Sequence, residues 1–321
     1  MASEFVSGAF RPRIQSAASY DNFQWKRAAV IRLQSTVLLV DILPQVGGKI
    51  AQIQDKASGH KLLIPPQRPY SPIPLDGDWL KHDTSGMDDC FPNVAAGAYP
   101  EAPWDSAILP DLGEWSHSSW KVRSWHSDEL TMETLGHRLP YFAVKTIRFL
   151  DQRTIEFSYS VENRGLFPMR FIWSAHPLIA VNGKFELVLP PGDMIFRLFP
   201  PSESVYSWPN FKGKSVATDW VAHGTTLKIF VTGLAEGWCA LVLPQYTLHF
   251  AFDFHVVPVV GIWFNNFGFP RDGNRPFRCI AVEPCTSPSD RLDNLGAHAY
   301  PTISPGGSSQ WSMQLTVKNN E

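Results

Sequence analysis

A histidine at the end of a strand-like run is the first residue whose type and position could do chemistry. His176 follows the apolar run Phe171–Ala175 and stands directly before Pro177. The proline favours an extended conformation at His176 and ends sheet pairing, so the imidazole is expected at a strand end. Imidazole titrates near neutral pH and suits a general acid or base, although a satisfied structural histidine fits the same position.

A single carboxylate follows a second apolar run. Glu283 comes after Cys279–Val282 and precedes Pro284. An acid on a buried strand needs a charged partner or a raised pKa. Either state suits a general base, but a structural ion pair would perturb the carboxyl in the same way. Glu283 is therefore a candidate base with a structural alternative.

Acidic residues beside aromatic ones form a third group, in the Pro-, Asp-, Gly- and Trp-rich stretch 64–120. Asp88 and Asp89 precede Cys-Phe-Pro, and Glu114 lies within Pro110–Trp115. Carboxylates accept hydrogen bonds from hydroxyl groups, and flat rings cover the C–H faces of sugars. Long loops of this kind are often functional, which favours a sugar-binding role. Acids that cap turns explain the same spacing.

Several other chemistries lack their motifs. The chain has no HExxH, no Cys/His cluster with zinc spacing, no glycine-rich phosphate loop before a helix and no G-x-S-x-G. We therefore predict no metal and no cofactor-binding loop. The 4 cysteines form no CxxC pair, so we expect free thiols in a reducing cytoplasm.

The elements that must position these residues are predicted to be strands. Lys49–Asp55 alternates apolar and polar residues, and Thr154–Val161 alternates in the same way. No window carries a helical stripe, and 27 prolines and 22 glycines punctuate the runs as turns. The pattern predicts an all-β fold, a large antiparallel sandwich. Further predicted strands are Thr36–Leu43, Ala143–Phe149, Met169–Ser174, Phe185–Leu189, Thr226–Thr232, Cys239–Leu243, Thr247–Phe254, Val259–Phe264, Arg278–Val282 and Trp311–Val317.

Length and charge limit the classes of function. We expect the 321 residues to form one domain, 1–321, with 1–20 a loosely ordered N-terminal segment. Net charge is −2 with acids and bases interleaved, which argues against nucleic-acid binding. The most apolar stretch, 239–264, is broken by charged residues and a proline, so no membrane span is expected. The N-terminus lacks the apolar core of a signal peptide, and we predict a cytoplasmic protein.

Five segments together resemble the aldose 1-epimerase family and its galactose mutarotase-like relatives. Val40–Leu63 resembles the two strands with which that family opens. Asp88–Val94 (DDCFPNV) resembles a D-E-C-F-P-x-I loop, and Pro110–Trp115 (PDLGEW) resembles a D-H-G-E-x-W loop. Ser174–Leu178 resembles the strand with the catalytic histidine, and Cys279–Asp290 the strand and turn with the catalytic glutamate. The segments follow one another in the family's order.

The resemblance implies a galactose mutarotase-like supersandwich that binds a small sugar in an open cleft, as a monomer or homodimer, with no cofactor. It implies that His176 is the general acid, that Glu283 is the general base, and that Asp88, Asp89 and Glu114 bind the substrate. The base would take the proton of the anomeric hydroxyl while the acid protonates the ring oxygen. The ring then opens, and reclosure gives the other anomer.

One departure from the family pattern bears on catalysis. The D-H-G-E loop of the closest relatives carries a second histidine, and this chain has Leu112 there. His117 would replace it in substrate binding only if the loop folds back. Leu112 also predicts a more apolar site, suited to a sugar that lacks a hydroxyl. Two functions remain: an epimerase-like isomerase, or a non-catalytic carbohydrate-binding protein on the same scaffold. A polysaccharide lyase is a third alternative, but no tyrosine-based site is identifiable.

Overall fold

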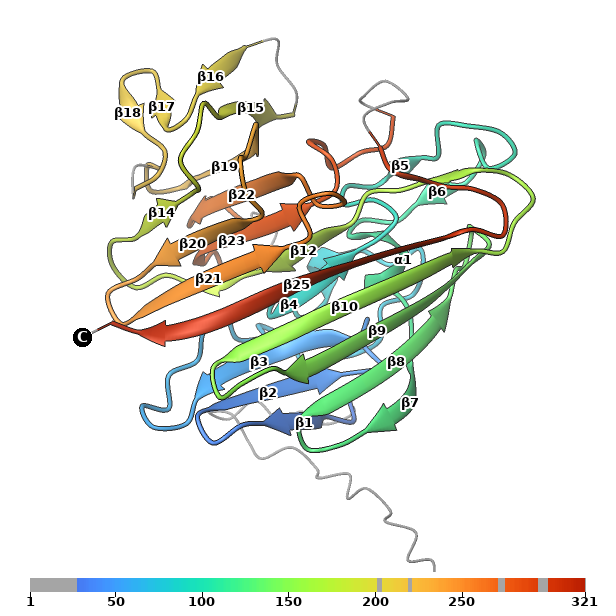
Figure 1. Ribbon diagram of the computed structural model, residues 1–321, viewed down its shortest axis with the longest axis horizontal. Helices are drawn as coiled ribbons and strands as arrows, with labels where there is room; N and C mark the ends of the chain where they lie inside the picture. The colour runs from blue at the N-terminus through green and yellow to red at the C-terminus, as the bar shows by residue number, and fades with distance from the viewer. Residues whose placement is uncertain (1–27, 201–203, 219–220, 271–274, 294–299, 321) are drawn as a thin grey trace, which may run out of the picture.

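Two large antiparallel sheets form the fold (Figure 1). The structure is a computed structural model that describes residues 28–200, 204–218, 221–270, 275–293 and 300–320. The predicted all-β class, a large antiparallel sandwich, is confirmed. The predicted N-terminal segment 1–20 lies outside the described residues. The assignment of the whole chain to one domain stays a prediction.

The first sheet has 11 strands and contains the segments singled out for chemistry. Its order across the sheet is β1 (Ile31–Gln34), β2 (Leu38–Leu43), β3 (Lys49–Asp55), β4 (Met87–Cys90), β12 (Ser174–Pro177), β23 (Arg278–Cys285), β22 (Val259–Asn266), β19 (Thr225–Thr232), β15 (Ile195–Phe199) and β16 (Val205–Ser207), with β13 (Ile179–Ala180) also paired to β23. Strands from both halves of the chain thus meet in its middle.

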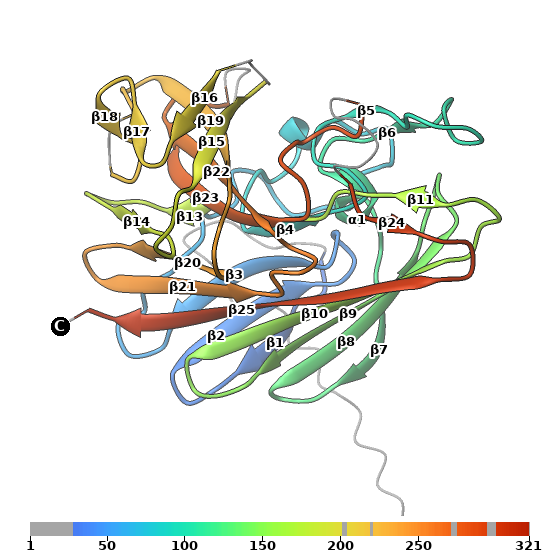
Figure 2. The same ribbon diagram turned by 45° about the horizontal axis from the view of Figure 1, so that its top comes forward.

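The second sheet has 8 strands and runs across the front of the view in Figure 1. Its order is β14 (Glu186–Val188), β20 (Trp238–Val242), β21 (Tyr246–Phe252), β25 (Ser308–Asn319), β10 (Thr154–Asn163), β9 (Tyr141–Phe149), β8 (Glu129–Leu135) and β7 (Lys121–Trp125). The turned view in Figure 2 shows it lying along one face of the first sheet.

Three short strand pairs and two short helices complete the described elements. The pairs are β5 (Gly97–Ala98) with β6 (Ile108–Leu109), β11 (Met169–Arg170) with β24 (Thr302–Ile303), and β17 (Asn210–Phe211) with β18 (Lys214–Ser215). The helices are the 3-10 turn η1 (Trp79–Lys81) and α1 (Gly113–Ser116).

The apolar residues of the alternating sequence patterns form the core between the sheets. On β10, the predicted apolar face, namely Ile155, Phe157, Tyr159 and Val161, is buried. The register pairs Tyr159 with Trp311 of β25, and these rings stack at 5.6 Å. Side chains of one strand alternate between its two faces, so a single polar–apolar alternation is enough to define the buried side.

The turn between β2 and β3 is fixed by its two glycines. Gly47 and Gly48 have φ angles of +69° and +61°, which side-chain-bearing residues rarely adopt. A Cβ atom on Gly47 would lie 2.8 Å from the Cα atom of Ser116 in α1. The Gly-Gly turn therefore lets the β2–β3 connection pack directly against the 110–118 segment.

The stretch 64–120 is less loop-like than its composition indicates. It contains β4, β5, β6, η1 and α1. Strand β4 has the sequence MDDC, and its two adjacent acids hide the apolar alternation that marks a strand. The sequence patterns also did not predict the hairpin of β7 and β8, although buried and half-buried residues alternate along β8.

No helix among the described residues is long and apolar enough to cross a membrane.

Candidate functional site

The candidate site lies on the face of the 11-stranded sheet that points away from the 8-stranded sheet. Residues opposite one another on paired strands share a face, and β4, β12, β23, β22 and β19 are successive neighbours. Their registers place functional side chains on one face: Asp88 opposite His176, Ser174 opposite Cys285, Gly261 opposite Glu283, and Trp263 opposite Lys228.

The structure brings His176 and Glu283 together. His176 Nε2 lies 3.8 Å from Glu283 Oε1. Both side chains are covered, His176 being 7% exposed and Glu283 0%. Glu283 Oε1 and His176 Nδ1 have no hydrogen-bond partner in the part of the chain that the structure describes. A Cβ atom on Gly261 would stand 3.3 Å from the Cβ of Glu283, so the glycine makes room for the carboxylate on the next strand.

The other oxygen of Glu283 is held by a lysine. Lys228 Nζ donates to Glu283 Oε2 at 2.8 Å and to Asp290 Oδ1 at 2.6 Å. The hydroxyl of Ser174 lies 3.2 Å from the same Oε2 atom. Burial alone would lower the pKa of Lys228, but the charges of Asp290 and Glu283 raise it above its usual value. The ammonium group therefore stays charged.

His176 is held neutral by its surroundings. Burial lowers the pKa of His176 to about 3, and the positive charge of Lys228 acts in the same direction. The contact with Glu283 is therefore not an ion pair in the free protein at neutral pH.

Aromatic rings surround the imidazole. Trp79 of η1 meets His176 edge-on at 6.3 Å, and Trp263 of β22 stacks on it at 6.0 Å. Phe269 packs against both tryptophans. The buried indole nitrogen of Trp79 has no hydrogen-bond partner among the residues described. Rings of this kind supply the apolar contacts that a sugar face requires.

Asp88 lies on the same face in a second lysine cluster. Lys49 Nζ lies 2.5 Å from Asp83 Oδ2 and 3.2 Å from Asp88 Oδ2. Burial raises the pKa of Asp88 to about 6, against the opposing effect of Lys49. Within the described ranges of the chain, the Oδ1 atom of Asp88 has no hydrogen-bond partner.

Asp89 points to the opposite face of β4. It forms an ion pair with Lys145 of β9 and accepts a hydrogen bond from the Tyr159 hydroxyl at 2.7 Å. These partners belong to the 8-stranded sheet, so Asp89 lies between the sheets. The structure therefore separates Asp89 from His176 and Glu283, because side chains alternate along a strand.

The 110–118 segment holds the remaining predicted residues. Glu114 is buried and accepts hydrogen bonds from the backbone N–H groups of His137 and Arg138, at 3.1 and 2.7 Å. His117 Nδ1 lies 2.9 Å from the Gly113 carbonyl. No contact joins Glu114 or His117 to His176 or Glu283 among the interactions of the described residues.

Leu112 belongs to the core. It is buried, packs within the main apolar cluster and adopts a φ of +59° at the start of α1. Its neighbour Asp111 is exposed as a residue, but its carboxyl group lies among protein atoms, and this desolvation raises the pKa of the carboxyl to about 6. The charges of Asp290 and Asp78 act in the same direction. Asp111 therefore interacts electrostatically with Asp290 and Lys228 of the Lys228 cluster.

Sequence reasoning missed Lys228, Asp290 and Lys49. Lys228 carried a usable signal, because it interrupts the apolar run of β19 (TTLKIFVT), where a charge requires a buried partner. Asp290 closes the segment that resembles the glutamate strand, but nothing in the sequence links it to Lys228. Only the sheet order, in which β22 lies between β19 and β23, brings Lys228 of β19 near Glu283 of β23.

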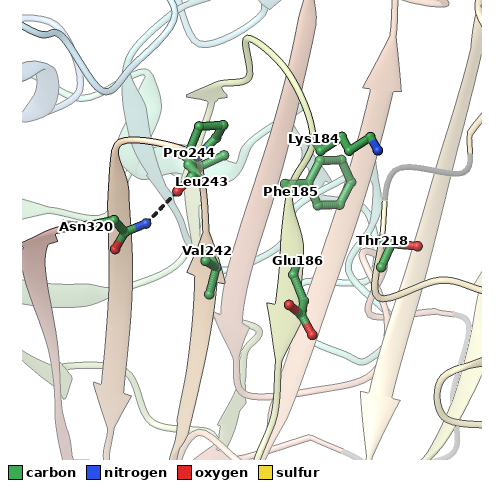
Figure 3. A pocket seen from close by; sticks show the side chains of 8 residues that line it. All are labelled: Lys184, Phe185, Glu186, Thr218, Val242, Leu243, Pro244 and Asn320. Carbon is green, nitrogen blue, oxygen red and sulfur yellow. Dashed lines mark hydrogen bonds between the residues drawn. The ribbon is translucent and has the colours of Figure 1, made fainter.

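Two further features lie elsewhere. A cavity of about 730 Å³ opens at strand β14, the edge of the 8-stranded sheet, and Figure 3 shows the side chains around it. None of the predicted site residues is among those that line it. Within the described part of the chain, no group of three or more His, Cys, Asp or Glu side chains is arranged to hold a metal ion.

The comparisons with known proteins identify the fold. No family model matches the chain, and no curated protein matches it by sequence. Solved structures do match. The Slr1438 protein from Synechocystis sp. PCC 6803 superposes with a TM-score of 0.70 at 14% identity, covering 94% of this chain and 100% of that one.

Two more matches are named after sugar-epimerising enzymes. A galactose mutarotase-like protein from Lactobacillus casei ATCC 334 has a TM-score of 0.65 at 17% identity, covering 90% of this chain and 100% of that one. The homologue of GalM/aldose epimerase from C. elegans has a TM-score of 0.66 at 12% identity, covering 92% and 100%. The chain thus has the galactose mutarotase-like fold, as the resemblance implied; at these identities the likeness extends to the fold alone.

Proposed function

We propose that this protein is an aldose 1-epimerase-like isomerase that interconverts the anomers of a free sugar. The observation that carries the proposal is the His176–Glu283 pair, two titratable side chains 3.8 Å apart on a galactose mutarotase-like sheet. The facing oxygen of Glu283 has no hydrogen-bond partner among the described residues. A carboxylate oxygen with no partner is available to a hydroxyl proton.

In this reaction Glu283 accepts one proton while His176 donates another, so the number of protons on the pair is unchanged. Glu283 Oε1 takes the proton of the anomeric hydroxyl, the bond between C1 and the ring oxygen breaks, and the aldehyde forms. The ring oxygen takes a proton from His176. Rotation about the C1–C2 bond and the reverse steps return both protons and give the other anomer. His176 has to be protonated for the first step, so we expect the rate to rise as pH falls from 8 to about 5.

The charge of the site favours an uncharged sugar. The two lysines, Lys49 and Lys228, each contact two carboxylates, namely Asp83 and Asp88, and Glu283 and Asp290. These six groups hold more negative than positive charge and offer oxygen atoms that accept hydrogen bonds from hydroxyl groups. We expect free hexoses to be preferred over sugar phosphates or uronic acids, because an anion would meet like charge.

Polarimetry on freshly dissolved α-anomers tests the proposal. Wild-type protein should accelerate the decay of optical rotation. The Glu283→Gln variant should lose about 10²–10⁴-fold in kcat/KM, because glutamine keeps the shape of the side chain but cannot take a proton. His176→Asn should also slow the reaction, and the two losses should be less than additive since the groups act as a pair. Unchanged catalysis in Glu283→Gln would remove Glu283 from the mechanism.

The alternative is a carbohydrate-binding protein that does not catalyse. The neutral state of His176 favours it, because an imidazole whose pKa lies at about 3 is a poor proton donor at pH 7. Calorimetric titration with the same sugars separates the two functions. Measurable binding without mutarotation of any sugar, lost in Glu283→Gln, would establish the binding protein.

A further inference from the structure

Lys228 is the charged group in direct contact with the proposed base, and it has no part in the mechanism described above. Its ammonium group is covered, with 9% of the side chain exposed, and lies between Glu283 and Asp290 at 2.8 and 2.6 Å. Both contacts are as short as charge-assisted hydrogen bonds become. The three residues come from β19, β23 and the segment that follows β23.

Lys228 determines which carboxylate oxygen is available. It occupies Oε2 of Glu283 together with the Ser174 hydroxyl, at 2.8 and 3.2 Å. The remaining oxygen, Oε1, faces His176 Nε2 at 3.8 Å. Rotation of the carboxylate would break both hydrogen bonds to Oε2, so the direction of Oε1 depends on Lys228.

Lys228 also sets the charge of its neighbours. A cation in contact with a buried carboxylate favours the ionised form of that carboxylate, and the same cation disfavours a positive charge on His176. Other titratable groups face the pair. Asp290 opposes Lys228, and burial raises the pKa values of the Cys90, Cys279 and Cys285 thiols, which stay neutral. Lys49 also lowers the pKa of His176, and among the interactions of the described residues Lys228 is the cation in contact with Glu283.

We propose that Lys228, anchored by Asp290, is the positioning residue of the Glu283–His176 pair: it directs Oε1 of Glu283 towards the sugar and places a positive charge next to the pair. This assignment rests on the proposed function for its catalytic meaning. The positive charge of Lys228 then favours the ionised carboxylate that a base needs, and it disfavours the protonated imidazole that an acid needs.

The first test needs no sugar. Protein labelled with ¹³C at the Glu side-chain carboxyl and ¹⁵N in the His ring is titrated by NMR, and Glu283→Gln and His176→Asn assign the two signals. In Lys228→Met, the Glu283 carboxyl should protonate at a pH at least about one unit higher than in wild type, and His176 should also protonate at higher pH. Lys228→Arg should restore both midpoints towards wild type because it keeps the charge.

Asp290→Asn should shift the protonation midpoints of Glu283 and His176 in the opposite direction. Removing this carboxylate leaves Lys228 to Glu283 alone, so both Glu283 and His176 should protonate at lower pH than in wild type. This variant retains the lysine and its contact with Glu283, so it also serves if Lys228→Met does not fold.

The matched control is Lys145→Met. Lys145 is another buried lysine in an ion pair, but it lies between the sheets with Asp89. It should leave both midpoints unchanged when measured below its melting temperature. Unchanged midpoints in folded Lys228→Met would overturn the proposal. If Lys228→Met does not fold, unchanged midpoints in Asp290→Asn would overturn it. Shifts in Lys145→Met equal to those in Lys228→Met would also overturn it.

A second readout connects the inference to catalysis. In Lys228→Met, kcat/KM at pH 7 should fall at least about tenfold, the acid limb of its pH profile should move to higher pH, and Lys228→Arg should recover most of the loss. If the wild type catalyses no mutarotation, the proposed function fails while the NMR result still decides the role of Lys228. If catalysis is present but its pH profile is the same in Lys228→Met, the positioning role is refuted.

Discussion

The two faces of the 11-stranded sheet hold buried lysine–carboxylate groups that differ in how completely they are paired. On the inner face, Lys145 contacts Asp89 and the Gly48 carbonyl, and Tyr159 bonds the other oxygen of Asp89. On the outer face, Asp88 Oδ1 and Glu283 Oε1 have no hydrogen-bond partners among the residues that the structure describes. A stabilising network satisfies its members, whereas a binding site keeps acceptors for a ligand.

Asp88 and Asp89 show this difference within one strand. They are adjacent on β4, equally buried at 2% exposure, and yet only Asp89 has both oxygens bonded. The difference predicts that substitutions on the inner face reduce stability, and that substitutions on the outer face reduce function.

The largest expected effect on stability comes from the inner face. Asp89→Asn removes the charge that compensates Lys145, and it should lower the free energy of unfolding by about 3–5 kcal/mol. Urea denaturation measures this loss. The double variant Asp89→Asn/Lys145→Met should recover part of it, because no uncompensated charge remains. The activity per folded molecule should stay near wild type; a specific loss of sugar binding would instead place Asp89 in the site.

Substitution of Asp88 on the outer face should change the free energy of unfolding by a smaller amount, and this change should depend on pH. The pKa of Asp88 is raised from 3.8 to about 6, so the folded state favours its protonated form. The stability from this group is therefore present below pH 3.8 and is lost as pH rises through about 6. At pH 7, Asp88→Asn should raise the free energy of unfolding by about 1–3 kcal/mol relative to wild type.

Urea denaturation of both proteins at pH 4 and 7 measures this effect. The gain should shrink towards zero at pH 4, and sugar affinity should fall in Asp88→Asn. A loss of stability at pH 7 would mean that the contact with Lys49 outweighs the burial of Asp88.

The smallest effect is expected at Glu114. Its oxygens accept from two backbone N–H groups, and Glu114→Gln keeps one acceptor. The free energy of unfolding should fall by about 1 kcal/mol, with sugar affinity and kcat/KM within about twofold of wild type. Differential scanning calorimetry and polarimetry check the two values. A tenfold loss of affinity would support the substrate-binding role that the sequence predicts for Glu114.

Much of the fold could be predicted from the sequence, because its signals are local. Lys49–Asp55 and Thr154–Val161 alternate residue by residue, and the structure has strands over both ranges. The missed strand β4 shows the limit: adjacent acids on opposite faces read as a polar loop, although each is buried against its own lysine. Hydrophobic patterning cannot recognise a strand whose charges are neutralised by distant segments.

The candidate site could also be predicted only in part from the sequence. His176 and Glu283 could be chosen as candidates from the sequence, because each is a titratable residue that follows an apolar run and precedes a proline, although β23 continues past Glu283 to Cys285. Their 3.8 Å approach depends on β12 and β23 being neighbours. The sequence could not separate Asp88 from Asp89, because the pairing register of β4 decides which one faces His176. Lys228 is held to Glu283 and Asp290 across sequence separations of 55 and 62 residues. Contacts at such separations are set by the order of strands in the sheet, and local sequence patterns carry no information about that order.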